Sequence, residues 1–358
     1  MFSMFASDTA QGAAQGLIPD LVPEGYHGRT SGIKALLEIP LPLLFVSFFV
    51  SKMISKGDYW GAILSTLIVL FISMTISLFV PERSLDSRIK KLEWHSFLRL
   101  VLMTVVFTIV VLLMGEVTKV SIIYFDKYFT PLNSLLVAFI GFICIIIAII
   151  FGVTMSIHIG IGSPKPENSY FLWVINRLTF LVGSVNLSSF MIYFLQERFS
   201  ELSGNNAAGP ASFLVMFVGI SVLLSIVSSG WLIDKYGNKP IMVAGSVLAT
   251  LGTLIALLSP LMEYIYLGGG IIGLGIGMFY VASWALGTKI VPKKYAGQYL
   301  GVSNLAGAGA GAVGAYLGGP IADAFGYIPL FIIYGLLFTL STVALVWIKE
   351  QRSANTKL

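Results

Sequence analysis

Residues Gly230–Pro240 read Gly-Trp-Leu-Ile-Asp-Lys-Tyr-Gly-Asn-Lys-Pro, and they gather one acidic and two basic side chains between two long apolar runs. The flanking runs, Leu202–Ile233 and Pro240–Met262, contain no charged side chain. Charge is costly in hydrocarbon, so a charged segment between two such runs belongs in water at the turn between two membrane-spanning helices. The stretch therefore predicts a helix–turn–helix unit at a membrane surface.

The composition of the whole chain agrees with a membrane protein. The sequence is 56% hydrophobic and only 11% charged, and its mean hydropathy is +0.89. Soluble domains carry roughly 25% charged residues. The net charge of +5 follows the loops between apolar runs, so we predict no nucleic-acid partner. Cys144 is the one cysteine and lies in an apolar run, which excludes a disulfide framework.

The apolar runs give the number of spans, because a membrane helix needs about 20 apolar residues. A further run, near 30–51, is interrupted by Lys34 and Glu38 and by Pro40 and Pro42. We predict an all-α membrane protein with about ten transmembrane helices and a partial one at the start. The charge-free runs are Tyr59–Pro81, Leu100–Gly115, Tyr128–Ile157, Leu178–Gln196, Leu202–Ile233, Pro240–Met262, Tyr264–Thr288, Tyr295–Ala322 and Ala324–Trp347.

The orientation follows from lysine and arginine, which favour cytoplasmic loops. If the Asp234 loop is cytoplasmic, seventeen of the 22 basic residues fall on the inner side. We therefore predict a multi-pass protein of the plasma (inner) membrane with both termini in the cytoplasm.

The Gly230–Pro240 stretch resembles the loop motif of the major facilitator superfamily, Gly-x-Leu-x-Asp-Arg-x-Gly-Arg-Lys. Lys235 and Asn238 stand where that motif usually has arginine. The resemblance implies a helical bundle of two halves that rocks around a solute site near the middle of the membrane. The matching residues are Gly230, Leu232, Asp234, Gly237 and Lys239.

A second pattern is an internal repeat. The segment Asp20–Ile33 aligns with Lys289–Val302 at a constant offset. In the superfamily this turn joins helices four and five, and helices ten and eleven. The identical pairs are Val22 and Val291, Pro23 and Pro292, Tyr26 and Tyr295, Gly28 and Gly297, and Gly32 and Gly301.

The alignment implies a superfamily member that lacks its first three helices and most of the fourth. A wrong start, a fragment or a real loss would each explain this. The segment Ile18–Pro23, followed by Gly28-Arg29, looks like the sugar-cation symporter and sucrose-carrier-like groups. The expected units are 1–82, the remainder of the N-terminal bundle; 83–95, a cytoplasmic linker; 96–160, an inserted two-helix hairpin with its outer turn at 116–131; 168–350, a C-terminal six-helix bundle; and 351–358, a cytoplasmic tail.

The resemblance assigns a gating role to the charged loop. The Asp234 carboxylate would meet the positive N-terminal end of the helix that starts near Gly28, with Arg29 close by, and would hold the cytoplasmic side shut. The alternative is a solvated turn charge. The predicted gating set is Gly230, Asp234, Lys235, Gly237, Lys239 and Arg29.

Ionisable groups inside membrane spans are candidates for the solute or ion pathway. Asp8, Gln11 and Gln15 have the spacing of one helix face, although the same stretch also reads as a solvated tail. Glu38 is a candidate proton carrier, but Lys34 lies four residues earlier and could simply pair with it.

The second half supplies the other pathway candidates. Arg177, next to Asn176, could bind an anionic or hydroxyl-rich solute or extend to the lipid headgroups. Tyr280 and Trp284 are four residues apart in the span that resembles the tenth helix. They could stack on a sugar ring or simply pack against other helices.

The sequence predicts no cofactor, no metal and no enzyme activity. The Gly309–Gly314 pattern lies inside a membrane span and indicates close helix packing rather than a dinucleotide site. The three histidines are scattered, and no ATP-binding loop is present. We expect a monomeric secondary transporter for a small solute, with sugars as candidates, coupled to protons or sodium. The alternative is a non-transporting membrane binding protein or sensor, or an inactive fragment of a transporter.

Overall fold

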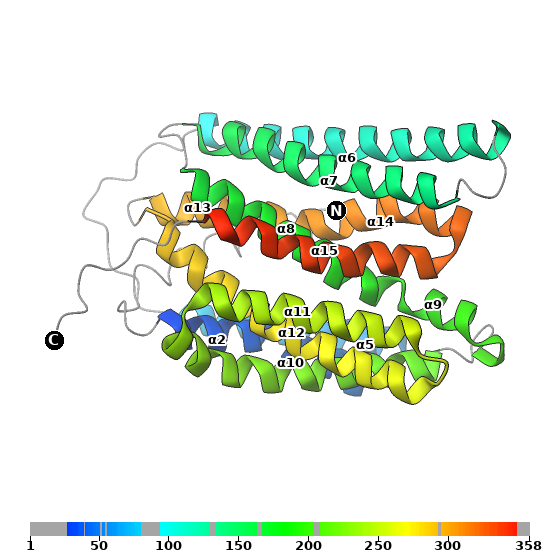
Figure 1. Cartoon of the computed structure of the whole chain (residues 1–358). Coiled ribbons are helices and arrows are strands. Elements are labelled where there is room, and N and C mark those ends of the chain that lie inside the picture. Colours follow the sequence, from blue (N-terminus) through cyan, green and yellow to red (C-terminus); the bar gives the residue numbers. More distant parts are fainter. Residues whose placement is uncertain are drawn as a thin grey trace.

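The computed structural model describes residues 27–38, 40–50, 52–53, 56–79, 94–128, 134–162, 167–202, 208–292 and 295–348. Every regular element in these ranges is a helix, and the long helices lie side by side in an elongated bundle (Figure 1). The elements are α2 His27–Glu38, α3 Pro40–Phe45, the π-helical turn η2 Val46–Val50, α5 Tyr59–Ser77, α6 Trp94–Tyr128, α7 Ser134–Ile161, α8 Asn168–Ser189, α9 Met191–Arg198, the 3-10 turn η4 Ser200–Leu202, α10 Ala208–Tyr236, α11 Asn238–Leu258, α12 Met262–Ile290, α13 Ala296–Ser303, α14 Leu305–Phe325 and α15 Tyr327–Trp347.

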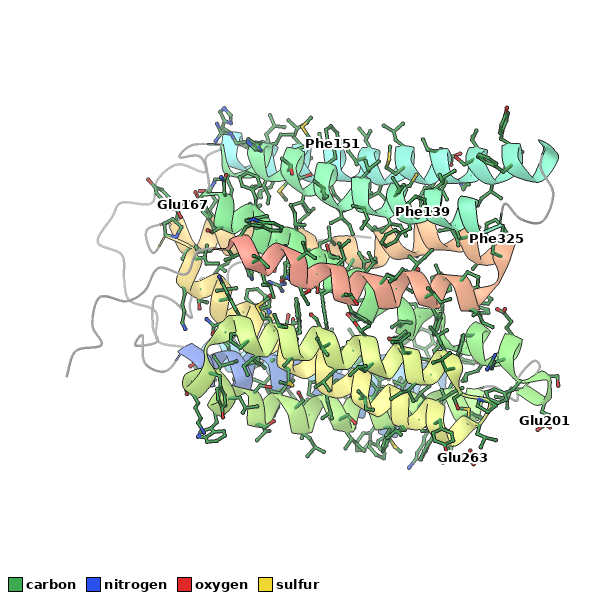
Figure 2. All side chains as sticks on the ribbon, viewed as in Figure 1. Phe139, Phe151, Glu167, Glu201, Glu263 and Phe325 are labelled. Atoms are coloured by element: carbon green, nitrogen blue, oxygen red, sulfur yellow. The ribbon has the colours of Figure 1, made fainter. Side chains whose placement is uncertain are left out.

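Within the described ranges, nine segments are long and apolar enough to cross a membrane. The sides of the bundle are apolar: Phe139 and Phe151 on α7 are 58% and 52% exposed. Three exposed carboxylates lie at the two ends, Glu167 at one and Glu201 and Glu263 at the other (Figure 2). The prediction of an all-α, multi-pass membrane bundle is confirmed.

The tenth predicted span, near 30–51, is broken into α2, α3 and η2. Pro40 has no N–H to donate to the carbonyl of Leu36, and its ring disfavours a helical conformation in the preceding residue. Pro42 follows two residues later. Helix α2 ends at Glu38 and α3 begins at Pro40, and residue 39 between them lies outside the described residues.

The hairpin of α6 and α7 differs from its prediction in one respect. The outer turn was expected at 116–131, but α6 continues as a helix to Tyr128, so that prediction was wrong. An ion pair one turn apart stabilises the extension, because Lys119 Nζ lies 2.8 Å from Glu116 Oε1. The Tyr316 hydroxyl of α14 donates to the same carboxylate at 2.8 Å and joins the hairpin to the second half.

The tightest helix pair in the second half is α11 with α12. Glycines face each other across it: a Cβ added to Gly245 would lie 2.7 Å from the carbonyl oxygen of Gly275 and 2.9 Å from the nitrogen of Phe279. Small residues let membrane helices approach closely. Gly268 and Gly275 of α12 thus pack directly against α11, whereas the glycines between them face α10.

We expect Gly245→Ala to destabilise the folded bundle by roughly 1–3 kcal/mol, because the added methyl group meets backbone atoms that cannot rotate away. The measurement is the melting temperature of the purified protein in detergent. Gly301→Ala is the control, since nothing lies within 4 Å of a Cβ added there. Equal melting temperatures for the two variants would contradict the close backbone contact.

Candidate functional site

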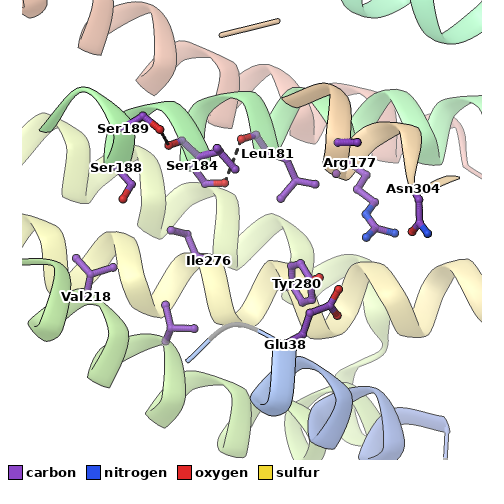
Figure 3. Close-up of a pocket in the computed structure, with 14 residues that line it drawn as sticks. Glu38, Arg177, Leu181, Ser184, Ser188, Ser189, Val218, Ile276, Tyr280 and Asn304 are labelled. Carbon is purple, nitrogen blue, oxygen red and sulfur yellow. Dashed lines mark hydrogen bonds between the residues drawn. The ribbon is translucent and has the colours of Figure 1, made fainter. Parts of the chain in front are cut away.

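A cavity of about 590 Å³ lies between α8 and α14 on one side and α2, α10 and α12 on the other (Figure 3). Its lining combines two charged side chains with hydroxyl groups and aliphatic side chains. The lining residues are Glu38, Arg177, Leu181, Ser184, Val185, Ser188, Ser189, Val218, Val222, Ile276, Tyr280, Asn304, Gly307 and Ala308.

Three polar lining residues, Glu38, Arg177 and Tyr280, lie at one depth in the bundle. Helices α2 and α8 begin, and α12 ends, on the side where α13 lies (Figure 1). At 1.5 Å per residue, Glu38, Arg177 and Tyr280 each lie roughly 14–16 Å along their helices from that side. Half of a bilayer's hydrocarbon core is about 15 Å. The charged groups of the cavity therefore lie near the middle of the membrane.

Residues at equivalent positions of the internal repeat line this cavity. The offset that pairs Gly28 with Gly297 also pairs His27 with Ala296, the residues at which α2 and α13 begin. The same offset pairs Glu38 with Gly307, and both line the cavity. Equivalent positions of the two halves thus face one space, which is the arrangement expected of a repeat-built transporter.

One charged group of the cavity is already paired. Lys34 Nζ lies 3.1 Å from Glu38 Oε2, one helical turn apart on α2, and the two side chains are only 18% and 22% exposed. The Tyr280 hydroxyl of α12 also interacts with the Glu38 carboxylate. The two charges are therefore balanced within α2, and Glu38 of the pair lines the cavity.

Trp284 brings the cationic groups together. Lys34 Nζ lies 3.4 Å from the centre of the Trp284 ring, and the guanidinium carbon of Arg177 lies 3.8 Å from it. Both distances are within the range of a cation–π interaction, which strengthens when the groups are shielded from water. Trp173 and Tyr280 complete the aromatic surround, with ring centres 5.7 and 5.9 Å from the same guanidinium carbon.

Arg177 carries the unbalanced charge of the site. Its side chain is 4% exposed. The one nearby carboxylate among the described residues that acts on it, Glu38, is shared with Lys34. Arg177 Nη1 has no hydrogen-bond acceptor in the part of the chain that the structure describes, and neither do Trp284 Nε1 and Asn304 Nδ2. Two of these donors, on Arg177 and Asn304, line the cavity. The third belongs to Trp284, whose ring centre is 3.8 Å from the Arg177 guanidinium carbon.

Asn176, the neighbour of Arg177, points elsewhere. Its amide donates to the carbonyl oxygen of Ser341 in α15 at 2.6 Å, and its side chain is fully buried. Successive helical residues are about 100° apart, so Asn176 faces α15 while Arg177 faces the cavity. The structure brings Glu38, Arg177, Tyr280 and Trp284 together and places Asn176 in a helix–helix contact.

Several lining residues were not singled out from the sequence. Ser184 and Ser188 continue the face of α8 that starts at Arg177 and Leu181, with helical spacing that would have identified them. Asn304 lies between α13 and α14, where the helix is interrupted. That interruption was not predictable from the sequence, because no proline or glycine occupies the position.

The charged loop lies at the end of the bundle. Asp234 is exposed in the last turn of α10, and Gly237 makes the turn into α11 with a φ of 88°, a value that favours glycine. Lys239 Nζ donates to the carbonyl oxygen of Ile348, after α15. Lys235 Nζ lies 5.2 Å from the Trp231 ring centre. Two of the motif's basic residues are thus engaged within the second half.

Helix α2 packs against α10, the helix that ends in the Asp234 turn. A Cβ on Gly32 would lie 3.9 Å from the carbonyl oxygen of Ile226. The two helices run in opposite directions (Figure 1), so the start of α2 lies near the last turns of α10. The Arg29 side chain lies outside the described residues, as do Asp8, Gln11 and Gln15.

The described residues hold no group of three or more histidine, cysteine, aspartate or glutamate side chains placed to bind a metal ion. No curated protein and no solved structure matches the chain.

A family model gives the assignment. Residues 178–358 match the model described as Major Facilitator Superfamily, and this region contains most of α8, all of α10–α15 and the Asp234 loop. Together with a helical bundle of membrane-spanning length and a central cavity, the match identifies the chain as a member of the major facilitator superfamily of secondary transporters.

Proposed function

We propose that the protein moves a small solute across the membrane by alternating access. The proposed binding site is the cavity bordered by α8 and α14 on one side and by α2, α10 and α12 on the other. The observation that carries the proposal is the set of charged and aromatic side chains near mid-membrane depth, contributed by both repeat halves. Charge at that depth is costly and is retained where it serves a solute or ion pathway.

The Asp234 loop is the proposed gate on the side where α2 begins. A carboxylate near a helix N-terminus is stabilised by about 0.3–1 kcal/mol. That energy is available only while the last turn of α10 lies beside the first turn of α2. Separation of the two helices would open this side of the cavity. The gate set remains Gly230, Asp234, Lys235, Gly237, Lys239 and Arg29.

Glu38 is the proposed coupling group, for a proton or for sodium. It lines the cavity, and its charge is held by Lys34 at 3.1 Å. A proton or sodium ion on Glu38 would compete with Lys34 for the carboxylate. Ion binding would therefore change the charge that the cavity presents to the solute.

The test is uptake into proteoliposomes that contain the purified full chain. Sugars and sugar acids are supplied outside under an imposed pH gradient or, separately, a sodium gradient. We expect accumulation above the outside concentration with one of the two gradients, and loss of accumulation when an ionophore removes that gradient. Vesicles without protein are the control. Solute binding without uptake under either gradient would favour the alternative, a membrane binding protein or sensor.

A further inference from the structure

We infer that the cavity selects an organic anion, and that a carboxylate of the solute binds the Arg177 guanidinium beside Lys34 and Trp284. The inference names the substrate class of the proposed transport site and therefore rests on the proposed function for its physiological meaning. Its physical basis is separate: the charge balance and the unpartnered donors at one end of the cavity.

The charge balance favours an anion over a neutral solute or a cation. The cluster holds two cations, Lys34 and Arg177, and one carboxylate, Glu38, which pairs with Lys34 at 3.1 Å and also acts on Arg177 through its charge. These three described groups therefore sum to one positive charge. An isolated buried charge costs several kcal/mol unless it is paired. The cation–π contact with Trp284 offsets only part of that cost. A bound anion would supply the missing charge, whereas a cation would add to the imbalance.

The buried hydrogen-bond donors that have no acceptor also favour an anion. Arg177 Nη1, Trp284 Nε1 and Asn304 Nδ2 are donors without acceptors. Buried donors are nearly always satisfied in folded proteins. A carboxylate offers two oxygens with about four acceptor sites and no donor. One carboxylate in this end of the cavity therefore matches the polarity of all three groups.

The rest of the lining fits an organic body rather than a bare inorganic ion. Beyond the charged end, the cavity is bordered by the hydroxyl groups of Ser184 and Ser188 and by the aliphatic side chains of Leu181, Val222 and Ile276. Its volume of about 590 Å³ is in the usual range of small-molecule sites. A hydroxylated acid of sugar size would meet serines with its hydroxyl groups and Arg177 with its carboxylate.

The choice of arginine supports a carboxylate ligand. A guanidinium presents a planar fork that pairs with a carboxylate through two parallel hydrogen bonds, and a lysine ammonium lacks that geometry. The guanidinium carbon lies 3.8 Å from the Trp284 ring centre, a contact that restrains the Arg177 side chain. Arg177→Lys should therefore keep the attraction for an anion but bind it less well than the wild-type protein.

The experiment compares glucuronate with glucose, which share a ring and differ at one carbon, a carboxylate in place of a hydroxymethyl group. The melting temperature of the purified full chain is measured in detergent at neutral pH with millimolar glucuronate, glucose, chloride or sulfate. We expect glucuronate to raise the melting temperature by about 3 °C, through preferential binding to the folded state. Glucose, chloride and sulfate should leave it unchanged.

Single substitutions test which residues bind glucuronate. Arg177→Gln should weaken glucuronate binding by about 30-fold or more, the usual cost of truncating a buried charged partner, and Arg177→Lys should restore part of it. Lys34→Gln should also weaken binding. Lys119→Gln is the matched control, because Lys119 also pairs with a glutamate, at 2.8 Å, and lies 4.8 Å from a tyrosine ring centre, but it is outside the cavity.

Three results would overturn the inference: glucose stabilising the protein as well as glucuronate does, no glucuronate shift at all, or a shift that survives Arg177→Gln in a variant that still melts cooperatively. Stabilisation by chloride or sulfate equal to that by glucuronate would also overturn the organic-anion assignment. Binding is measured without transport, so the two proposals can fail separately. Glucuronate binding without gradient-driven uptake would retain the anion site and refute the transport function.

Discussion

Replacing Glu38 by glutamine is expected to abolish gradient-driven accumulation while leaving solute exchange intact. Glutamine keeps the size and shape of the side chain but neither titrates nor carries charge, so no proton or sodium ion can compete with Lys34 for it. Lys34 would lose the partner now 3.1 Å away. Accumulation in proteoliposomes under the imposed gradient should fall to the level of empty vesicles, and exchange of labelled for unlabelled solute should continue.

The control for this variant is Glu116→Gln. Glu116 also pairs with a lysine one turn away, at 2.8 Å, but on α6 and away from the cavity, so its loss should leave accumulation unchanged. Accumulation by the Glu38→Gln variant at the wild-type level would show that coupling resides in another group. Loss of both accumulation and exchange would show that Glu38 is needed to bind or move the solute itself.

Replacing Asp234 by asparagine is expected to open the side of the cavity where α2 begins. The neutral amide loses the attraction of the α2 N-terminus, worth about 0.3–1 kcal/mol, which corresponds to a shift of about 2- to 5-fold between closed and open forms. The readout is the labelling rate of a Ser184→Cys reporter by a membrane-impermeant thiol reagent. The native Cys144 is buried and should contribute little background.

The comparison carboxylate is Asp323, which is exposed near the end of α14 on the opposite side of the bundle (Figure 1). Asp323→Asn should leave the labelling rate unchanged, whereas Asp234→Asn should raise it by about 2- to 5-fold and lower transport without reducing membrane insertion. Identical labelling in the two variants would refute the gate and leave Asp234 as a solvated turn charge.

The helices were predictable from the sequence because their signal is local. Runs such as Pro240–Met262 contain no charge over the length of a bilayer, and the structure has α11 there. The break after Glu38 was also signalled, by Pro40. The end of α6 was not, because Glu116 and Lys119 look like turn residues until their ion pair and their contact with Tyr316 on a distant helix are known.

The site was predictable only in part because its composition depends on how helices rotate against one another. Glu38, Arg177 and Tyr280 were recognised as unusual residues for a membrane span, and all three line the cavity. Asn176 was recognised for the same reason, yet it contacts α15. The face of α8 that turns toward the cavity is set by packing against α12, α14 and α15, which a single sequence does not reveal.

The broken helix formed by α2 and α3 has a mechanical consequence. A continuous rod moves as one body, so tilting its outer end would displace its inner end as well. The missing amide donor at Pro40 removes a helical hydrogen bond between the segment that carries Lys34 and Glu38 and the segment that follows. We therefore expect less resistance to bending at this point than in an uninterrupted helix, so that the two segments can tilt by different amounts.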